Sequence, residues 1–187
     1  MNIIPNEIQG CYEIQPRLSI DERGSFVKTF NDSFFKSKGL ATNFKESYYS
    51  RSKKGVLRGM HFQTPPHDHE KMVYCTEGEV IDVVIDLRLD SLTFGKHQKF
   101  ILSADKANII YIPAGLAHGF YVLSEYATMV YNVTSIYSPE SDSGIHWASA
   151  GIDWPDNRPI VSKRDDGLVT LANFEEKTFA KAVTANE

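Results

Sequence analysis

The segment EVIDVVIDL, Glu79 to Leu87, decides the fold class of this chain. Its odd-numbered positions from 81 onward are all apolar: Ile81, Val83, Ile85 and Leu87. Its even-numbered positions mix two aspartates, Asp82 and Asp86, with two valines. Because alternate side chains of a strand point to opposite sides, this pattern predicts a β-strand with one core face and one mixed face.

Similar short segments, rich in Val, Ile, Tyr and Phe and bounded by turn residues, recur along the chain. The remaining predicted strands are Gly10 to Ile14, Ser25 to Phe30, Lys71 to Thr76, His97 to Leu102, Ala107 to Ile112, Gly119 to Leu123 and Ala127 to Ser135. The predicted helices are two and short: Phe34 to Lys38, capped by Asn31 to Ser33, and Phe174 to Val183, opened by Asn173 with Glu176. Many strands without long helices between them favour a mostly β sandwich or barrel of jelly-roll type with short peripheral helices.

Composition narrows the functional class. A chain of 187 residues with 42% apolar residues is predicted to form one domain, 1–187, with a core at about 10–165 and a peripheral segment at 166–187. The formal net charge of −4 gives no reason to expect nucleic-acid or membrane binding. The first ten residues lack a basic, then hydrophobic, leader pattern, so a cytoplasmic protein with two reduced cysteines is expected.

Chemistry-bearing residues gather around GVLRGMH, Gly55 to His61. A histidine beside fixed positive charge suits proton removal next to a carbonyl, because cations can stabilise the enolate that forms. If the segment after this turn is extended, Lys71 has the parity of Val73 and points into the barrel. The motif PAGLAHGF adds a second histidine, His118.

Two tyrosines and one carboxylate complete the candidates. Tyr131 and Tyr137 are six residues apart and could line one wall of a cavity as proton donor and stacking surface. Asp165, in the polar segment SKRDD, would orient His61 if that segment folds back onto it.

The ordered set of these motifs resembles the dTDP-4-dehydrorhamnose 3,5-epimerase family of nucleotide-sugar epimerases, which are cofactor-free enzymes of the cupin fold. The resemblance runs from about Gly10 to Asp165. It is carried by DERGSF (21–26), GVLRGMHFQ (55–63), Lys71, GEVIDVVIDLR (78–88), SLTFG (91–95), IPAGLAHGF (112–120), Tyr131, YSP (137–139), GIHW (144–147), IDWP (152–155) and SKRD (162–165).

The resemblance implies a role for each motif residue. His61 would be the general base, paired with Asp165, while Tyr131 would deliver a proton to the opposite face of the sugar. Lys71 would stabilise the enolate oxygen, and His118 would line the sugar pocket. No metal or nicotinamide cofactor is expected.

The family also implies how the nucleotide is held. Arg23 and Arg58 would bind the diphosphate. A homodimer with an exchanged N-terminal strand would bring Phe26 and its neighbours to the nucleotide site of the other subunit.

Three positions associated with the nucleotide depart from the family. Lys28 stands where Glu is usual, Glu46 where Gln is usual, and Tyr48 where Asn is usual. Cytosine offers acceptors and an amino donor that suit Lys28 and Glu46, so a CDP-sugar mono-epimerase is the alternative to a dTDP-sugar enzyme. The sequence leaves open whether C3, C5 or both are inverted.

Two other functional classes remain. His67 and His69, with His118, suggest an open metal site similar to that of metal-binding cupins, and hence a metal-dependent oxygenase or isomerase. In those proteins a glutamate follows the HxH pair after three or four residues, whereas here Glu70 follows directly and Lys71 opposes a divalent metal. The prediction is therefore that no metal is bound. A non-catalytic sugar-nucleotide binding module is the other alternative.

Overall fold

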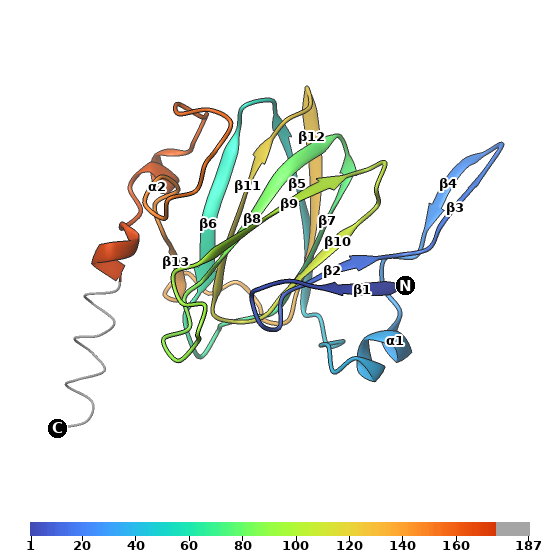
Figure 1. The fold of residues 1–187 in the computed structure, drawn as a ribbon, viewed down its shortest axis with the longest axis horizontal. Helices are drawn as coiled ribbons and strands as arrows, with labels where there is room; N and C mark the ends of the chain where they lie inside the picture. The colour runs from blue at the N-terminus through green and yellow to red at the C-terminus, as the bar shows by residue number, and fades with distance from the viewer. Residues whose placement is uncertain (175–187) are drawn as a thin grey trace.

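The structure is a computed structural model that describes residues 1–174, and two antiparallel sheets facing each other dominate it (Figure 1). The six-stranded sheet has the order β1 (Asn2–Pro5), β2 (Tyr12–Gln15), β10 (Ile109–Ile112), β7 (Lys71–Glu77), β12 (Tyr126–Val133) and β5 (Glu46–Lys53). The five-stranded sheet has the order β13 (Asp142–Gly144), β6 (Leu57–Gln63), β11 (Leu116–Val122), β8 (Glu79–Asp86) and β9 (His97–Ser103). This architecture confirms the predicted mostly β, jelly-roll fold.

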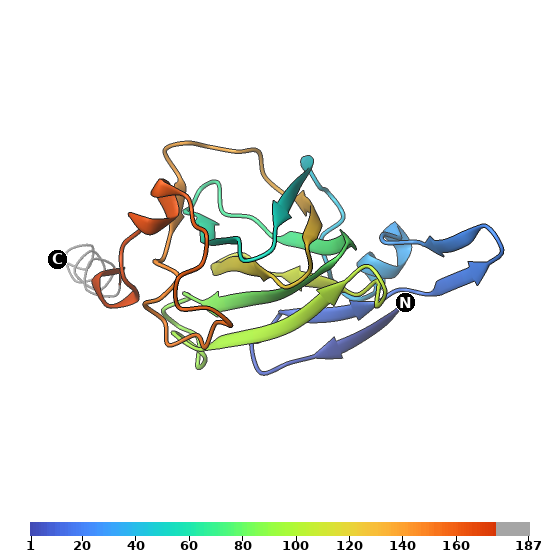
Figure 2. The same ribbon diagram turned by 90° about the horizontal axis from the view of Figure 1, so that it is seen from above.

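The remaining elements lie at the periphery. Strands β3 (Leu18–Asp21) and β4 (Gly24–Val27) form a separate hairpin that projects away from both sheets (Figures 1 and 2). Helices α1 (Asp32–Ser37) and α2 (Lys163–Asp166) lie on opposite sides of the molecule. No helix among the described residues is long and apolar enough to span a bilayer.

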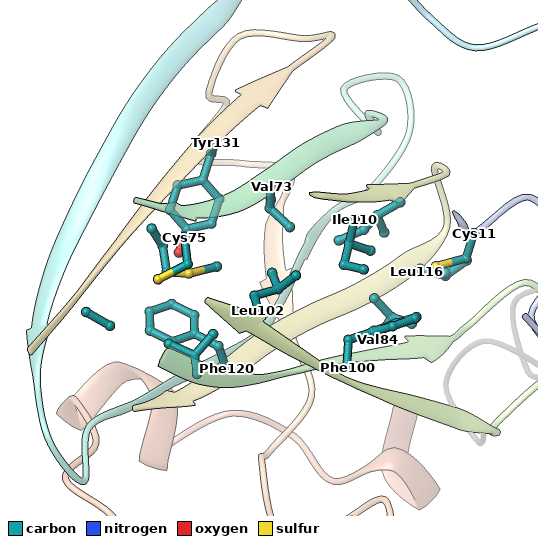
Figure 3. Packing of buried hydrophobic residues seen from close by; sticks show 14 of the residues in the cluster. Cys11, Val73, Cys75, Val84, Phe100, Leu102, Ile110, Leu116, Phe120 and Tyr131 are labelled. Atoms are coloured by element: carbon teal, nitrogen blue, oxygen red, sulfur yellow. The ribbon is translucent and has the colours of Figure 1, made fainter. Parts of the chain in front are cut away.

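The hydrophobic core has three layers. The interior cluster contains residues from both sheets, including Val84, Phe120 and Tyr131, and is shown in Figure 3. A second cluster covers the outer face of the five-stranded sheet with side chains from residues 145–174. The third packs Phe35 of α1 and Leu40 onto the outer face of the six-stranded sheet.

Strand β8 is buried on both faces. Val80 and Val84 belong to the interior cluster, whereas Val83 and Ile85 belong to the outer cluster under residues 145–174. Asp82 therefore lies on the interior face and is fully buried. The sequence predicted that this strand has one core face and one mixed face. In the structure the mixed face lines the interior of the barrel, and the apolar face packs under residues 145–174.

Several element boundaries differ from the prediction. Strands β1, β3, β5, β6 and β13 were not predicted, and GVLRGMH is mostly strand β6 rather than a turn. Helix α1 confirms the predicted cap, because the Asn31 side chain accepts a hydrogen bond from the Phe34 N–H. The predicted helix Phe174 to Val183 lies, apart from its first residue, outside the described residues.

Candidate active site

His61 of β6 and Asp165 of α2 form a hydrogen-bonded pair. His61 Nε2 lies 2.8 Å from Asp165 Oδ1, and Gly59 N–H donates to Asp165 Oδ2 at 3.3 Å. Burial acts to raise the pKa of Asp165, but the hydrogen bonds from His61, Gly59 and Ser162 lower it below its usual value. Since an ionised carboxylate can only accept, Nε2 of His61 donates to Asp165, and in the neutral imidazole this leaves the lone pair on Nδ1.

Local backbone geometry allows this pair to form. Ser162 caps α2 by accepting from the Asp165 N–H, which holds the carboxylate at the first turn of the helix. On the other side, Gly59 has φ of +144°, and a Cβ there would lie 2.5 Å from Gly119 Cα. Glycine at both positions therefore lets β6 and β11 approach closely enough to place His61 over α2.

Lys71 begins β7 and is only 6% exposed, as its predicted parity required. Its Nζ donates to the backbone oxygen of His61 at 3.1 Å. Burial lowers the pKa of Lys71 to about 8, although the carboxylates of Asp82 and Asp142 act in the opposite direction. A cation is thus held beside the base in a largely dehydrated environment.

A second histidine and carboxylate pair lies deeper in the barrel. His118 Nε2 is 2.7 Å from Asp82 Oδ2, and both side chains are buried. The other oxygen of Asp82 has no hydrogen-bond partner among the described residues. This pair gives His118 a fixed ring orientation on the wall of the site.

Tyr131 is buried on β12 with its hydroxyl 3.4 Å from Ser50 Oγ. Its ring stacks on that of Tyr48, with centroids 4.9 Å apart and planes at 18°. Its edge contact with His118 has centroids 6.2 Å apart. Burial, the largest influence, raises the pKa of Tyr131, so the hydroxyl keeps its proton at neutral pH.

These groups surround two adjoining cavities. The inner one, of about 230 Å³, is lined by Tyr48, Ser50, Arg58, His61, Lys71, His118, Phe120 and Tyr131. Tyr48, His61 and Lys71 also line the outer one, of about 350 Å³. The predicted base, acid, cation and second histidine therefore meet in one place, together with Arg58, whose Nε donates to Ser52 Oγ.

The outer cavity holds two further predicted residues. Glu46 accepts a hydrogen bond from the Tyr137 N–H at 3.1 Å, and the Tyr137 hydroxyl donates to Asp142 at 3.3 Å. Strand β12 ends at Val133, so Tyr137 reaches the cavity from the following loop and not from the strand that carries Tyr131. Arg164 pairs with Asp142 at 2.7 Å on the same wall.

The three N-terminal candidates do not join this site within one chain. Arg23 pairs with Asp21 at the hairpin turn, and Phe26 is 65% exposed on the same hairpin. Lys28 lines a separate cavity with Phe26, whereas Glu46 and Tyr48 line the cavity next to His61. Lys28 thus shares no subsite with Glu46 and Tyr48 in a single chain.

The histidines of the metal interpretation have other partners. His67 Nδ1 lies 3.1 Å from Ser141 Oγ, and His69 Nδ1 lies 3.1 Å from Ser135 Oγ. Both lie in the loop before β7, and burial together with the charge of Lys71 lowers the pKa of His69 to about 3. Across residues 1–174, no three His, Cys, Asp or Glu side chains converge as a metal site.

Sequence reasoning missed several residues that support the site. Asp82 was visible as an aspartate in an otherwise apolar strand, but nothing local paired it with His118. Ser50 and Ser52 lie on the unpredicted strand β5, and Gly59 looked like part of a turn. Only the packing of the strands in three dimensions places them beside their partners.

Comparison with known proteins gives a consistent family. Residues 5–173 match the family model described as dTDP-4-dehydrorhamnose 3,5-epimerase. The chain is 43% identical to the Escherichia coli (strain K12) dTDP-4-dehydrorhamnose 3,5-epimerase, with 91% of this chain and 95% of the relative covered. It is 35% identical to a dTDP-4-dehydrorhamnose 3-epimerase of Streptomyces niveus, with 94% and 86% covered.

A solved structure shows the same arrangement of the chain. The Legionella pneumophila dTDP-6-deoxy-D-glucose-3,5-epimerase, in complex with dTDP-4-keto-L-rhamnose, has a TM-score of 0.87 and 39% identity, with 91% of this chain and 93% of that chain covered. Sequence, fold and the grouping of motif residues in one cavity agree. The chain therefore belongs to the dTDP-4-dehydrorhamnose 3,5-epimerase family.

Proposed function

We propose that this protein epimerises a dTDP-linked 4-keto-6-deoxyhexose at C3, C5 or both, through an enolate. The observation that carries the proposal is the single cavity lined by His61, Lys71 and Tyr131, with Asp165 hydrogen-bonded to His61. The ketone at C4 acidifies the hydrogens on C3 and C5, so proton transfer by side chains is sufficient chemistry. Relatives that are named for this activity align with nearly the whole chain.

His61 removes the proton. Nδ1 takes the hydrogen from carbon, and the electron pair moves onto the C4 oxygen as an enolate. The positive charge that His61 gains is stabilised by Asp165 at 2.8 Å. Lys71 donates one of its three N–H groups to the His61 carbonyl, and the remaining N–H groups can donate to the enolate oxygen.

Tyr131 completes the inversion. Its buried hydroxyl donates a proton to the carbon from the face opposite His61, and the enolate electrons reform the ketone. The resulting phenolate and imidazolium then exchange protons with solvent, so the enzyme returns to its starting state. His118, oriented by Asp82, lines the sugar pocket.

We further propose a cytoplasmic, single-domain homodimer in which the β3–β4 hairpin of each chain completes the site of the other. The hairpin projects from its own sheets and exposes apolar residues, among them Ile20 and Phe26. Arg23 would then join Arg58 at the diphosphate. Mixing two inactive variants, Arg23→Ala and His61→Ala, should restore activity, because one of the two sites in each mixed dimer is intact. Failure of mixed dimers to regain activity would contradict the exchange.

Nucleotide preference has its own test. Glu46 and Tyr137, which are hydrogen-bonded in the outer cavity, would face the base, and Lys28 would reach it from the other chain. Equilibrium binding of dTDP against CDP separates the proposal from the CDP-sugar alternative. A clear preference for CDP would overturn the dTDP assignment while leaving the proton chemistry intact.

The decisive experiment is incubation with dTDP-4-keto-6-deoxyglucose in deuterated water, followed by NMR at C3 and C5. We expect deuterium at one or both carbons, its loss in His61→Ala, and proton exchange with little inversion in Tyr131→Phe. Full exchange by His61→Ala would refute the assigned base. No exchange by the unmodified protein would favour a binding module, and activity that depends on stoichiometric metal would favour the metal-dependent class.

A further inference from the structure

Tyr48 makes a contact that the nucleotide-binding expectation did not include. On strands β5 and β12, Tyr48 and Tyr131 are directly opposite each other. Their rings lie almost parallel, at 18°, with centroids 4.9 Å apart. Cross-strand aromatic pairs of this kind restrain each other's ring orientation.

Tyr131 has little else to fix its hydroxyl. The hydrogen bond to Ser50 is 3.4 Å long, beyond the usual 2.5–3.0 Å range of such bonds. The other ring contact, with His118, is a looser edge contact at 6.2 Å. Among the described residues, the Tyr48 ring is therefore the closest planar support of the Tyr131 ring.

Tyr48 also stands at the junction of the two cavities. It lines both of them, together with His61 and Lys71, and is 46% exposed. An asparagine at this position could neither stack on Tyr131 nor fill this volume.

We propose that Tyr48 is a positioning residue that holds Tyr131 where it can protonate the enolate, and so determines how often proton removal ends in inversion. The proposal rests on the proposed epimerase function. The enolate has two fates: a proton from Tyr131 gives the inverted carbon, and a proton returned by His61 restores the original configuration. Loosening Tyr131 slows the first and leaves the second available.

Deuterated water separates the two fates. After His61 exchanges its proton with solvent, return by His61 yields deuterated substrate of unchanged configuration, whereas delivery by Tyr131 yields deuterated inverted product. The ratio of these two species, measured by NMR from dTDP-4-keto-6-deoxyglucose, reports the position of Tyr131. General damage to the site lowers both species and leaves the ratio alone.

Tyr48→Ala should raise the ratio of returned substrate to inverted product about 2- to 10-fold, the range expected from loss of one aromatic pair. Tyr48→Asn should do the same, while Tyr48→Phe should preserve the ratio because the stack remains. Tyr49→Ala is the matched control: its ring is 73% exposed and points to the opposite side of β5.

Three outcomes would overturn the inference. An unchanged ratio in both Tyr48→Ala and Tyr48→Asn, each verified as folded by thermal melting, would show that the stack does not position Tyr131. An equal shift in Tyr48→Phe would assign the effect to the hydroxyl. No deuterium uptake by the unmodified protein would overturn the epimerase function itself, and this inference with it.

Discussion

Replacing Lys71 with Met should stabilise the protein at pH 7 while removing its activity. The side chain is 6% exposed, and burial lowers the pKa of its ammonium group from 10.5 to about 8. The difference between these two pKa values corresponds to about 3 kcal/mol, which is the cost of keeping this lysine charged in the folded state. The variant loses one hydrogen bond to the His61 carbonyl, worth about 1 kcal/mol. The net expected gain in unfolding free energy is about 2 kcal/mol.

The pH dependence gives the sharper test. Below pH 8 the lysine is protonated in both states, so the full cost is present. Between pH 8 and pH 10.5 the unfolded chain binds more protons than the folded one, so the stability of the unmodified protein rises with pH relative to Lys71→Met. Between pH 7 and pH 10 this relative rise should be about 2.5 kcal/mol.

Urea unfolding at a series of pH values and one protein concentration measures both quantities. Lys53→Met, at the exposed end of β5, is the control for removing an ammonium group. A difference between Lys71→Met and the unmodified protein that stays constant from pH 7 to pH 10 would refute the assignment of a buried, charged lysine. Retention of full turnover by Lys71→Met would separately refute its role at the enolate.

Three further substitutions test how the site is held. Asp165→Asn should lower kcat by about two to four orders of magnitude, because an amide no longer enforces the histidine tautomer; a loss below tenfold in steady-state kinetics would contradict this. Ser162→Ala removes the cap of α2 and should cost about 1 kcal/mol in urea unfolding together with a fall in kcat, whereas Asn31→Ala should cost similar stability at the remote α1 and leave kcat unchanged. Gly59→Ala should lower the free energy of unfolding by about 3 kcal/mol or more, since its Cβ would meet the backbone of β11 at 2.5 Å. Gly39→Ala, with open space around the new Cβ, should lower it by about 1 kcal/mol. Equal melting temperatures for the two variants would argue against the close approach of β6 and β11.

The sequence predicted the strands that carry a strong apolar signal and missed those that do not. Alternation identified β8 and the burial of Lys71 at the start of β7, because both depend only on strand periodicity. Strand β5, ESYYSRSK, escaped notice because it is a mostly exposed edge strand. Strand β6 was missed because Gly59 looks like a turn residue, although in the structure this glycine allows β6 to lie close to β11.

The sequence likewise predicted some residues of the candidate site and missed others. The motifs and their family resemblance predicted a set of catalytic residues, and the structure places His61, Asp165, Lys71 and Tyr131 close together. The pairing of His118 with Asp82 and the Tyr48 stack depend on which strands are neighbours, which local periodicity does not contain. Nor does it reveal that residues 145–174 cover the second face of β8.

That outer layer has a consequence for how the enzyme becomes active during synthesis. The carboxylate that contacts His61 lies 104 residues further along the chain, within the segment 145–174 that covers the outer face of β8. A nascent chain can pair β6, β8 and β11 before residue 165 is made, yet His61 Nε2 then lacks the carboxylate that it contacts in the complete fold. Under the proposed mechanism, proton abstraction at the full rate therefore awaits the segment that covers the outer face of β8.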